Sequence, residues 1–533
     1  MKSEFLHAEG RDIVDGNGQK IILTGWGLGN WLVPEGYMWL SGDEKFDRFS
    51  RMNKIIEELA GTNYAEIFWH KYRENYVNKS DIMQMAQLGY NSVRIPLHYR
   101  LFMEEGSSLQ WKEEGFKILD KCIQWCEEAG IYAFLDLHAA PGGQTGRNID
   151  DSENDAPDLF LKEQNEEKCV ALWVELARRY RDKKIVGGYD LLNEPIAPPL
   201  VADYDYLIPQ LSKFYRRLIR EIRCVDQNHM LSIEGPHWAT DTSIFDCKFD
   251  DNMVLHFHRY AEEPDIRCLH KYIEVSYRLD IPLWMGETGE NTNEWYAAFY
   301  PLAYSLGIGY NLWTWKKMEC TNSPYSVNKP EEYEKIMDYI QKGIHPGEKK
   351  AREIFDRYLE NCRIEKCKEN SVVTNHVMHK VPFCMRATDF DECPGKGKSF
   401  WGTGNVNMET YRGTTGMEIV ELHKSKEKRF CFDCGWDRYG LVLHKGEFVC
   451  YQAVSDKDFV LCVSVQPTDT DCVIEVGWIS DEPKKVMLHE KSTAFEVEMK
   501  AGNGQIKVSA IEGKICMVLC QDLVQIKMRR SAG

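Results

Sequence analysis

The stretch Gly187-Gly188-Tyr189-Asp190-Leu191-Leu192-Asn193-Glu194-Pro195 ends an apolar run with a carboxylic acid and a proline. Such a run is typical of a short buried strand, and Pro195 prevents the strand from continuing. Glu194 is therefore predicted at the C-terminal tip of a strand, where barrel enzymes carry their chemistry. A buried acid is costly unless it has a role. The alternative is that Glu194 caps the next helix, because acidic residues often precede helices.

The same pattern recurs through the first two thirds of the chain: a segment with helical periodicity, a short apolar run, then Gly, Pro, His or an acidic residue. A β-hairpin across residues 15–18 is predicted to open the chain. The expected strands are residues 20–27, 92–95, 132–137, 187–194, 229–234, 253–257, 282–285 and 309–313. Eight evenly spaced units favour a (β/α)8 TIM barrel over an open sheet, and no GxGxxG or Walker loop points to a nucleotide.

The pattern changes past His345 to short strands in close succession, typical of an all-β jelly roll or sandwich. We expect these strands at residues 429–432, 441–444, 447–453, 459–466, 472–478, 494–499, 506–510 and 515–521. The predicted division is an α/β barrel domain over residues 1–345, a linker over 346–375 and a β-sandwich domain over 376–533.

Composition limits the partners. The formal charge of −17 argues against nucleic acid, whose binding depends on neutralising phosphates with Lys and Arg. No apolar run reaches membrane-spanning length, so we expect no membrane partner, and residues 1–10 lack the apolar core of a signal peptide. We therefore expect a cytoplasmic protein whose 18 cysteines are mostly reduced thiols. The acidic run 150–155 lacks EF-hand spacing and is interpreted as a solvated loop rather than a calcium site.

Polar and aromatic side chains cluster just past the expected strand ends. Because these ends share one barrel mouth, we expect the side chains to converge there. Two glutamates at strands four and seven suit a retaining glycosidase, in which one protonates the leaving oxygen and the other attacks the anomeric carbon. The candidate catalytic residues are Glu194, as acid/base, and Glu287, as nucleophile; the candidate substrate-binding residues are Arg94, His138, Asn193, His258, Tyr260, Trp313 and Trp315.

Further roles follow from side-chain chemistry. Arg94 and the Tyr260 hydroxyl would favour the charge of Glu287, and Asn193 would bond a sugar 2-hydroxyl. Trp313 and Trp315 are two residues apart, so on an extended segment both face the same way, and one should form the floor of the sugar subsite.

Six motifs in order carry a family resemblance: Arg94-Ile95-Pro96, Leu137 to Gly142, Leu192 to Pro195, His258-Arg259-Tyr260, Met285-Gly286-Glu287 and Leu312 to Lys316. With these motifs the chain resembles glycoside hydrolase family 5, and residues 27–32 resemble its exo-β-glucanase and β-glucosidase branch. The resemblance implies retention of configuration, no metal and no organic cofactor.

The C-terminal part is similar to carbohydrate-binding modules of families 6 and 35. Ala387-Thr388-Asp389-Phe390 and the segment 446–451 carry this likeness. Thr388 and Phe448 depart from the Glu and Trp of those modules, which favours a structural module over a sugar or calcium binder.

The sequence thus predicts a retaining β-glycosidase that hydrolyses β-glucosides or short β-gluco-oligosaccharides, with exo action. The alternatives are an endo-acting β-glucanase or β-mannanase, and a non-catalytic sugar-binding protein on a barrel scaffold. The two-carboxylate mechanism requires a separation of roughly 5 to 5.5 Å between the carboxyl groups. The sequence does not indicate an oligomeric state.

Overall fold

The computed structural model describes residues 4–106, 109–423, 438–466 and 470–521, and the chain forms two compact units. Unit 1 comprises Met1–Arg259, Lys271–Gly289 and Ile308–Glu369, and unit 2 comprises Tyr260–His270, Glu290–Gly307 and Asn370–Gly533. The last boundary between the two units, between Glu369 and Asn370, falls inside the predicted linker 346–375. Two segments from the barrel region of the sequence belong to unit 2. Among the described residues, no helix is long and apolar enough to cross a lipid bilayer.

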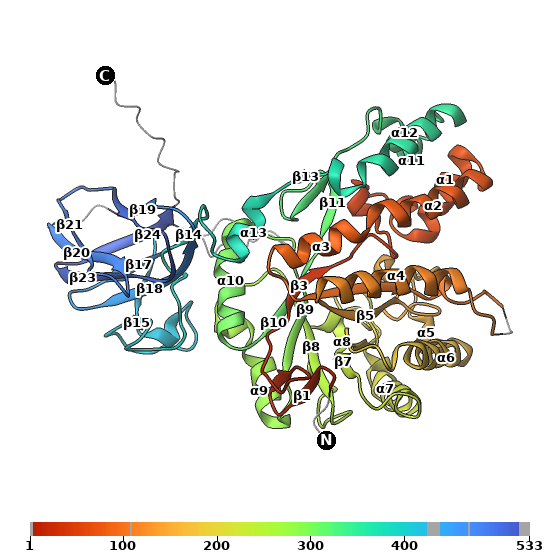
Figure 1. The fold of residues 1–533 in the computed structure, drawn as a ribbon, viewed down its shortest axis with the longest axis horizontal. Coiled ribbons are helices and arrows are strands. Elements are labelled where there is room, and N and C mark those ends of the chain that lie inside the picture. Colours follow the sequence, from red (N-terminus) through yellow and green to blue (C-terminus); the bar gives the residue numbers. More distant parts are fainter. Residues whose placement is uncertain (1–3, 107–108, 424–437, 467–469, 522–533) are drawn as a thin grey trace. The chain divides into compact units, whose positions relative to one another are not determined.

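Unit 1 is built around a closed parallel barrel of eight strands, which confirms the predicted fold class (Figure 1). The strands run in sequence order around the barrel, and β10 closes it by pairing with β3. Most of their residues are buried, as expected of strands covered on both faces. The barrel strands are β3 (Thr24–Gly27), β4 (Ser92–His98), β5 (Tyr132–Ala139), β6 (Val186–Asp190), β7 (Met230–Glu234), β8 (Met253–Arg259), β9 (Leu283–Gly289) and β10 (Gly309–Trp313).

Helices connect and surround these strands. In α7, buried residues recur at three- and four-residue spacing, for example Leu211, Tyr215 and Leu218, so one apolar face packs inward. The α-helices of this region are α1 (Phe49–Ala60), α2 (Thr62–Tyr76), α3 (Lys79–Gln87), α4 (Glu113–Ala129), α5 (Asp158–Leu161), α6 (Glu163–Tyr180), α7 (Ile208–Arg223), α8 (Pro236–Ala239), α9 (His270–Leu279), α11 (Glu334–Lys342) and α12 (Glu348–Asn361).

The N-terminal segment contains one hairpin more than predicted. Strands β1 (His7–Glu9) and β2 (Asp12–Val14) pair around Gly10, whose φ of 58° suits a tight turn. The predicted turn at residues 15–18 also forms: the Gly18 N–H donates to the Asp15 carbonyl at 2.9 Å, and the bridge between Val14 and Lys20 joins its two flanks. A second small sheet in unit 1 joins β11 (Lys316–Met318), β12 (Tyr325–Val327) and β13 (Lys368–Glu369).

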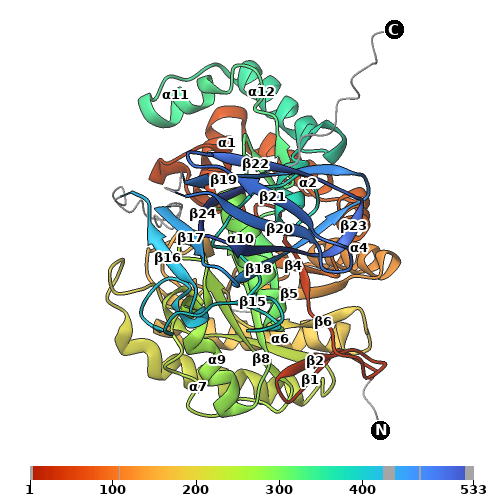
Figure 2. The same cartoon turned by 90° about the vertical axis from the view of Figure 1, so that its left-hand side faces the viewer.

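Unit 2 contains two antiparallel sheets, as the close succession of short strands predicted (Figure 2). Alternate side chains of both sheets form one apolar core that includes Val449, Val463 and Val508. One sheet contains β14 (Met385–Arg386), β16 (Glu418–Glu421), β17 (Tyr439–Leu443), β19 (Phe459–Gln466), β22 (Ala494–Met499) and β24 (Ile515–Gln521). The other contains β15 (Phe400–Trp401), β18 (Phe448–Ser455), β20 (Cys472–Trp478), β21 (Lys484–Leu488) and β23 (Gly502–Glu512).

Unit 2 also contains two helices, α10 (Asn293–Ser305) and α13 (Ser371–Val377), which pack against each other. The predicted strand at residues 429–432 lies outside the described residues. The remaining predicted strands of this part all overlap strands of the two sheets.

Candidate active site

The two glutamates singled out in the sequence lie together at one mouth of the barrel. Glu287 belongs to β9, whereas Glu194 follows β6 after three further residues. One carboxylate oxygen from each, and one ring nitrogen of His258, lie within 4.8 Å of one another. The next helical turn begins only at Asp205, and the Glu194 carboxylate contacts the Nδ1 atom of His258 at 2.7 Å. The capping alternative for Glu194 is therefore excluded.

The backbone of Glu194 adopts an uncommon conformation. Its φ of 45° lies in the left-handed region, which costs a non-glycine residue about 1–2 kcal/mol. Strain of this kind persists where surrounding contacts hold it, and it is concentrated at functional sites.

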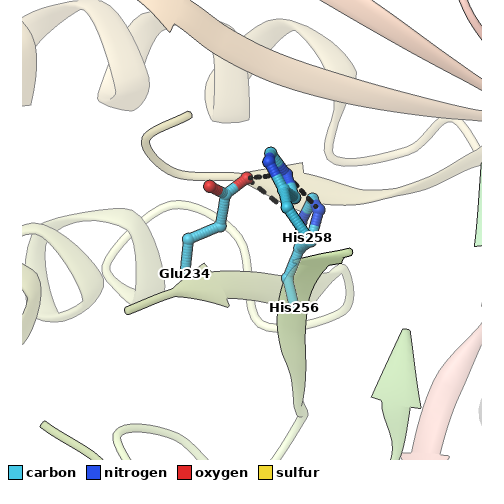
Figure 3. Close-up of side chains that lie close together, drawn as sticks. All are labelled: Glu234, His256 and His258. Carbon is cyan, nitrogen blue, oxygen red and sulfur yellow. Dashed lines mark hydrogen bonds and ion pairs between the residues drawn. The ribbon is translucent and has the colours of Figure 1, made fainter. Parts of the chain in front are cut away.

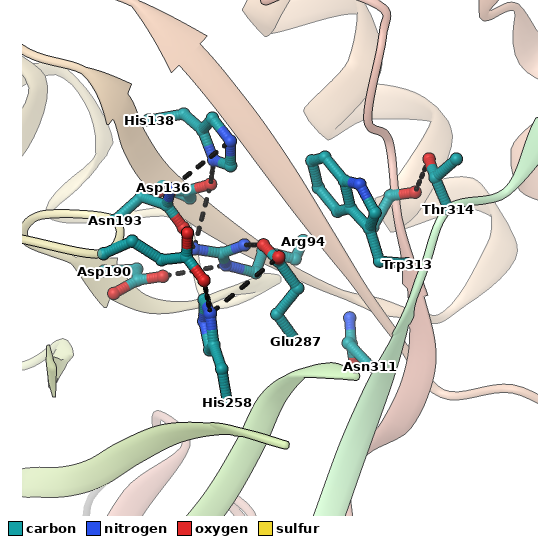
Figure 4. Close-up of polar contacts among 12 residues, drawn as sticks. Arg94, Asp136, His138, Asp190, Asn193, His258, Glu287, Asn311, Trp313 and Thr314 are labelled. Carbon is teal, nitrogen blue, oxygen red and sulfur yellow. Dashed lines mark hydrogen bonds and ion pairs between the residues drawn. The ribbon is translucent and has the colours of Figure 1, made fainter. Parts of the chain in front are cut away.

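Arg94 is the centre of the polar network beneath the mouth (Figure 4). Its buried guanidinium donates to Glu287 Oε2 at 2.6 Å, to Asp190 Oδ2 at 2.8 Å and to Asn193 Oδ1 at 2.8 Å. Its Nη2 atom also lies 3.1 Å from Asp136 and 3.2 Å from Glu234. Burial alone would lower the pKa of Arg94, but these four carboxylates raise it well above its ordinary value. A fixed cation thus faces Glu287.

One wall of the mouth is aromatic. The rings of His138 and Trp313 stack with centroids 5.2 Å apart and planes 6° from parallel (Figure 4). His138 Nδ1 lies 2.8 Å from Asp136, and Trp313 Nε1 donates to the Tyr37 hydroxyl at 2.9 Å. A Cβ atom on Gly29 would lie 2.6 Å from the Trp313 ring, so this glycine permits the close approach.

Trp315, a predicted substrate-binding residue, is oriented differently from Trp313. The expectation that Trp313 and Trp315 face the same way is wrong, because β10 ends at Trp313 and the alternation of an extended strand stops there. Trp315 is buried, donates to Asp81 Oδ1 at 2.9 Å and packs against Trp26. Tyr260 directly follows Arg259, the last residue of β8, and its role in substrate binding stays a prediction.

The acidic run 150–155 is not a solvated loop at its start. Asp150 is buried and accepts from the backbone N–H groups of Thr145 and Gly146, in the glycine-rich segment that follows β5. Asp151 is also buried, and it contacts His98 at 3.0 Å and Arg100 at 2.6 Å. These carboxylates are paired within the protein, and their role here is to shape the loop.

Sequence reasoning missed four buried residues of the network: Asp136, Asp190, Glu234 and His256. Glu234 ends β7 and is followed by Gly235 and Pro236, the same strand-end signal that identified the two candidate catalytic glutamates. The two aspartates lie within or at the end of strands, where a single sequence does not distinguish mouth-facing positions from others.

Glu234, His256 and His258 form a compact group of possible metal ligands (Figure 3). However, Glu234 Oε1 already lies 3.2 Å from Arg94 Nη2, and neighbouring carboxylates raise the pKa of His258 well above its ordinary value, despite burial, which alone would lower it. A divalent cation would be repelled by the guanidinium and would have to displace the histidine proton. The group is therefore better described as a hydrogen-bond network.

Comparisons with known proteins agree with this architecture. The family described as Cellulase (glycosyl hydrolase family 5) matches residues 52–319. A β-xylosidase of Phanerodontia chrysosporium is 33% identical over 259 residues, which cover 48% of this chain and 52% of that protein. A glucan 1,3-β-glucosidase of Lachancea kluyveri is 30% identical over 333 residues, which cover 58% of this chain and 72% of that protein. The chain spans about half the length of the first curated relatives it matches.

A crystal structure of endogalactoceramidase matches 96% of this chain and 99% of its own, with 15% identity and a TM-score of 0.44. The family match ends at residue 319, so the resemblance of the C-terminal part to carbohydrate-binding modules stays a prediction.

A closed eight-stranded barrel with two adjacent carboxyl groups at its mouth is the arrangement that barrel-type glycoside hydrolases use. Within that class, the chain belongs to glycoside hydrolase family 5.

Proposed function

We propose that the chain is a retaining β-glycosidase, specifically an exo-acting β-glucosidase for β-glucosides or short β-gluco-oligosaccharides. One observation supports the retaining mechanism: a carboxylate oxygen of Glu194 and one of Glu287 lie within 4.8 Å of each other. Retaining enzymes hold their carboxyl groups roughly 5 to 5.5 Å apart, whereas inverting enzymes leave room for a water molecule between them, at about 6.5 to 9.5 Å.

In this mechanism Glu287 attacks the anomeric carbon while the bond to the leaving oxygen breaks. Glu194 gives its proton to that oxygen, and a glycosyl ester of Glu287 forms. In the second step Glu194 takes a proton from water, the water oxygen attacks the anomeric carbon and the ester bond to Glu287 breaks. Arg94, 2.6 Å from Glu287, stabilises Glu287 as a free carboxylate before the first step and again after the second.

The stereochemistry of the product tests the mechanism. We expect NMR spectra recorded during hydrolysis of an aryl β-glucoside to show the β-anomer of glucose first, with the α-anomer appearing only by mutarotation. Initial release of the α-anomer would exclude the double displacement. A panel of nitrophenyl glycosides that includes xyloside, mannoside and galactoside would identify the sugar accepted.

Exo action is supported by the names of relatives, which include a β-xylosidase and several glucan 1,3-β-glucosidases. Endo action is the second candidate, because endoglucanases also match, at 25% identity over 197 residues. An end-labelled β-gluco-oligosaccharide separates the two: an exo enzyme releases single sugars from one end, whereas an endo enzyme first yields oligomers of intermediate length.

Replacing Trp313 by alanine is expected to lower kcat/KM about 10- to 100-fold, because the lost aromatic surface is worth about 1–3 kcal/mol of sugar binding. Trp315→Phe is the matched control. It removes the bond to Asp81 in the buried cluster, so it should lower the free energy of unfolding by about 1–2 kcal/mol and leave kcat/KM unchanged. Steady-state kinetics and urea unfolding measure the two effects. Equal kinetic losses in both variants would contradict this assignment of the two tryptophans.

A further inference from the structure

Glu234 uses both of its carboxylate oxygens at the site. Oε2 accepts a hydrogen bond from the backbone N–H of Glu194 at 2.6 Å. Oε1 lies 3.3 Å from His258 Nε2 and 3.3 Å from His256 Nδ1 (Figure 3). It also lies 3.2 Å from Arg94 Nη2. The residue is fully buried at the end of β7, so no water competes for these contacts.

These contacts form a closed ring with Glu194. From the Glu194 backbone the ring passes through Glu234 to the His258 imidazole, and from His258 Nδ1 back to the Glu194 carboxylate at 2.7 Å. Both ends of Glu194 are thus held through one carboxylate: its left-handed backbone directly, and its side chain through the histidine.

We propose that Glu234 is a positioning residue for the acid/base Glu194, which it fixes through the backbone N–H and through His258. This inference rests on the proposed function, because it assumes that Glu194 transfers the proton. It assigns a role to a residue that touches neither the sugar nor the reacting atoms in the mechanism above.

The charge of Glu234 matters as well as its shape. The groups that face His258 are Glu194, Glu234, Glu287 and His256. Burial alone would lower the pKa of His258, but Glu234 and Glu287 raise it well above its ordinary value. A charged imidazole donates from both nitrogens, so Nδ1 can bond Glu194 while Nε2 faces Glu234 Oε1 at 3.3 Å and His256 Nε2 at 3.1 Å. A neutral imidazole donates from a single nitrogen.

The test is Glu234→Gln, which keeps the shape of the side chain. Glutamine accepts at only one of its two positions, so it cannot serve both the Glu194 N–H and the His258 N–H. We expect kcat/KM for alkyl β-glucosides, whose leaving oxygen needs a proton, to fall about 100-fold, in line with the contribution of general acid catalysis. For 2,4-dinitrophenyl β-glucoside, whose leaving group departs without a proton, kcat/KM should stay within about threefold of the wild type.

Two further variants make the result interpretable. Asp226→Asn is the matched control, because Asp226 is also buried and contacts a histidine, His229, at 2.6 Å, outside the network described above; it should show no dependence on the leaving group. Glu234→Asp keeps the charge but is too short to bridge Glu194 and His258, so it should show the same leaving-group effect. It serves as the test if the glutamine variant does not fold.

The outcomes separate this inference from the proposed function. Suppose that Glu194→Gln shows the leaving-group effect, whereas the folded Glu234 variants lose activity equally on both substrates or lose none on either. Glu234 is then not a positioning residue for the acid/base. If the wild-type enzyme hydrolyses neither substrate nor any other glycoside, the proposed function itself fails.

Discussion

Glu287→Ala is expected to lower kcat/KM on aryl β-glucosides by roughly 10⁴-fold or more, because it removes the proposed covalent route altogether. Glu287 is 6% exposed and bonded to Arg94, so the substitution leaves a small cavity beside a cation at the floor of the mouth. Steady-state rates with nitrophenyl glucoside measure the loss.

Azide distinguishes the roles of the two glutamates. In Glu287→Ala the anion can enter the cavity and attack the anomeric carbon in a single displacement, which gives an α-glucosyl azide. In Glu194→Ala azide attacks the glycosyl ester of Glu287 instead and gives a β-glucosyl azide. The same azide anomer from both variants, or wild-type turnover in either one, would rule out the assigned roles.

The barrel could be predicted from the sequence because each strand is an apolar run followed by a polar or turn-forming residue. Strand β10 was predicted at its observed limits, 309–313, whereas β4 and β5 continue past theirs, to His98 and Ala139. His98 and His138 in these extensions are buried, and local sequence does not show burial that comes from other parts of the fold. The turn at Asp15 to Gly18 was predicted from its composition, whereas the pairing of residues 7–9 with 12–14 was not, because its turn has a weaker composition signal.

The site was predicted only in part, for a related reason. Glu194, His258 and Glu287 are polar residues next to strand ends. Their convergence was predictable because the C-terminal ends of the strands of a TIM barrel meet at one mouth. Asp190 precedes Leu191 inside an apolar run, and its contact with Arg94 depends on residues nearly one hundred positions apart. Trp315 was misassigned because two-residue periodicity holds only while the strand continues, and the partner that orients it, Asp81, lies in α3.

Arg94→Met is expected to lower the free energy of unfolding by about 3–5 kcal/mol, the usual cost of leaving buried charges without their partner. Four carboxylates would then face one another at the base of the mouth: Asp136, Asp190, Glu234 and Glu287. Activity should also fall, because Glu287 loses its 2.6 Å bond to the guanidinium. Arg94→Lys should be intermediate, since one ammonium group cannot replace the fork of donors.

Arg223→Met, which breaks a two-bond contact with Asp250 elsewhere in unit 1, should leave kcat/KM unchanged.

The pH dependence of this loss tests whether Arg94 acts by charge. Burial alone would raise the pKa of Asp190, but His256 and Arg94 hold it below its ordinary value. A depressed pKa contributes stability that is present above the unfolded value of about 3.9 and is lost as pH falls through the folded value. In Arg94→Met this contribution is weakened, and burial should raise the carboxylate pKa values, so that protonation relieves the repulsion as the solution is acidified. The difference in unfolding free energy between wild type and variant, measured by urea titration, should therefore be larger at pH 7 than at pH 5. An equal difference at both values would mean that Arg94 stabilises the barrel by packing rather than by its charge.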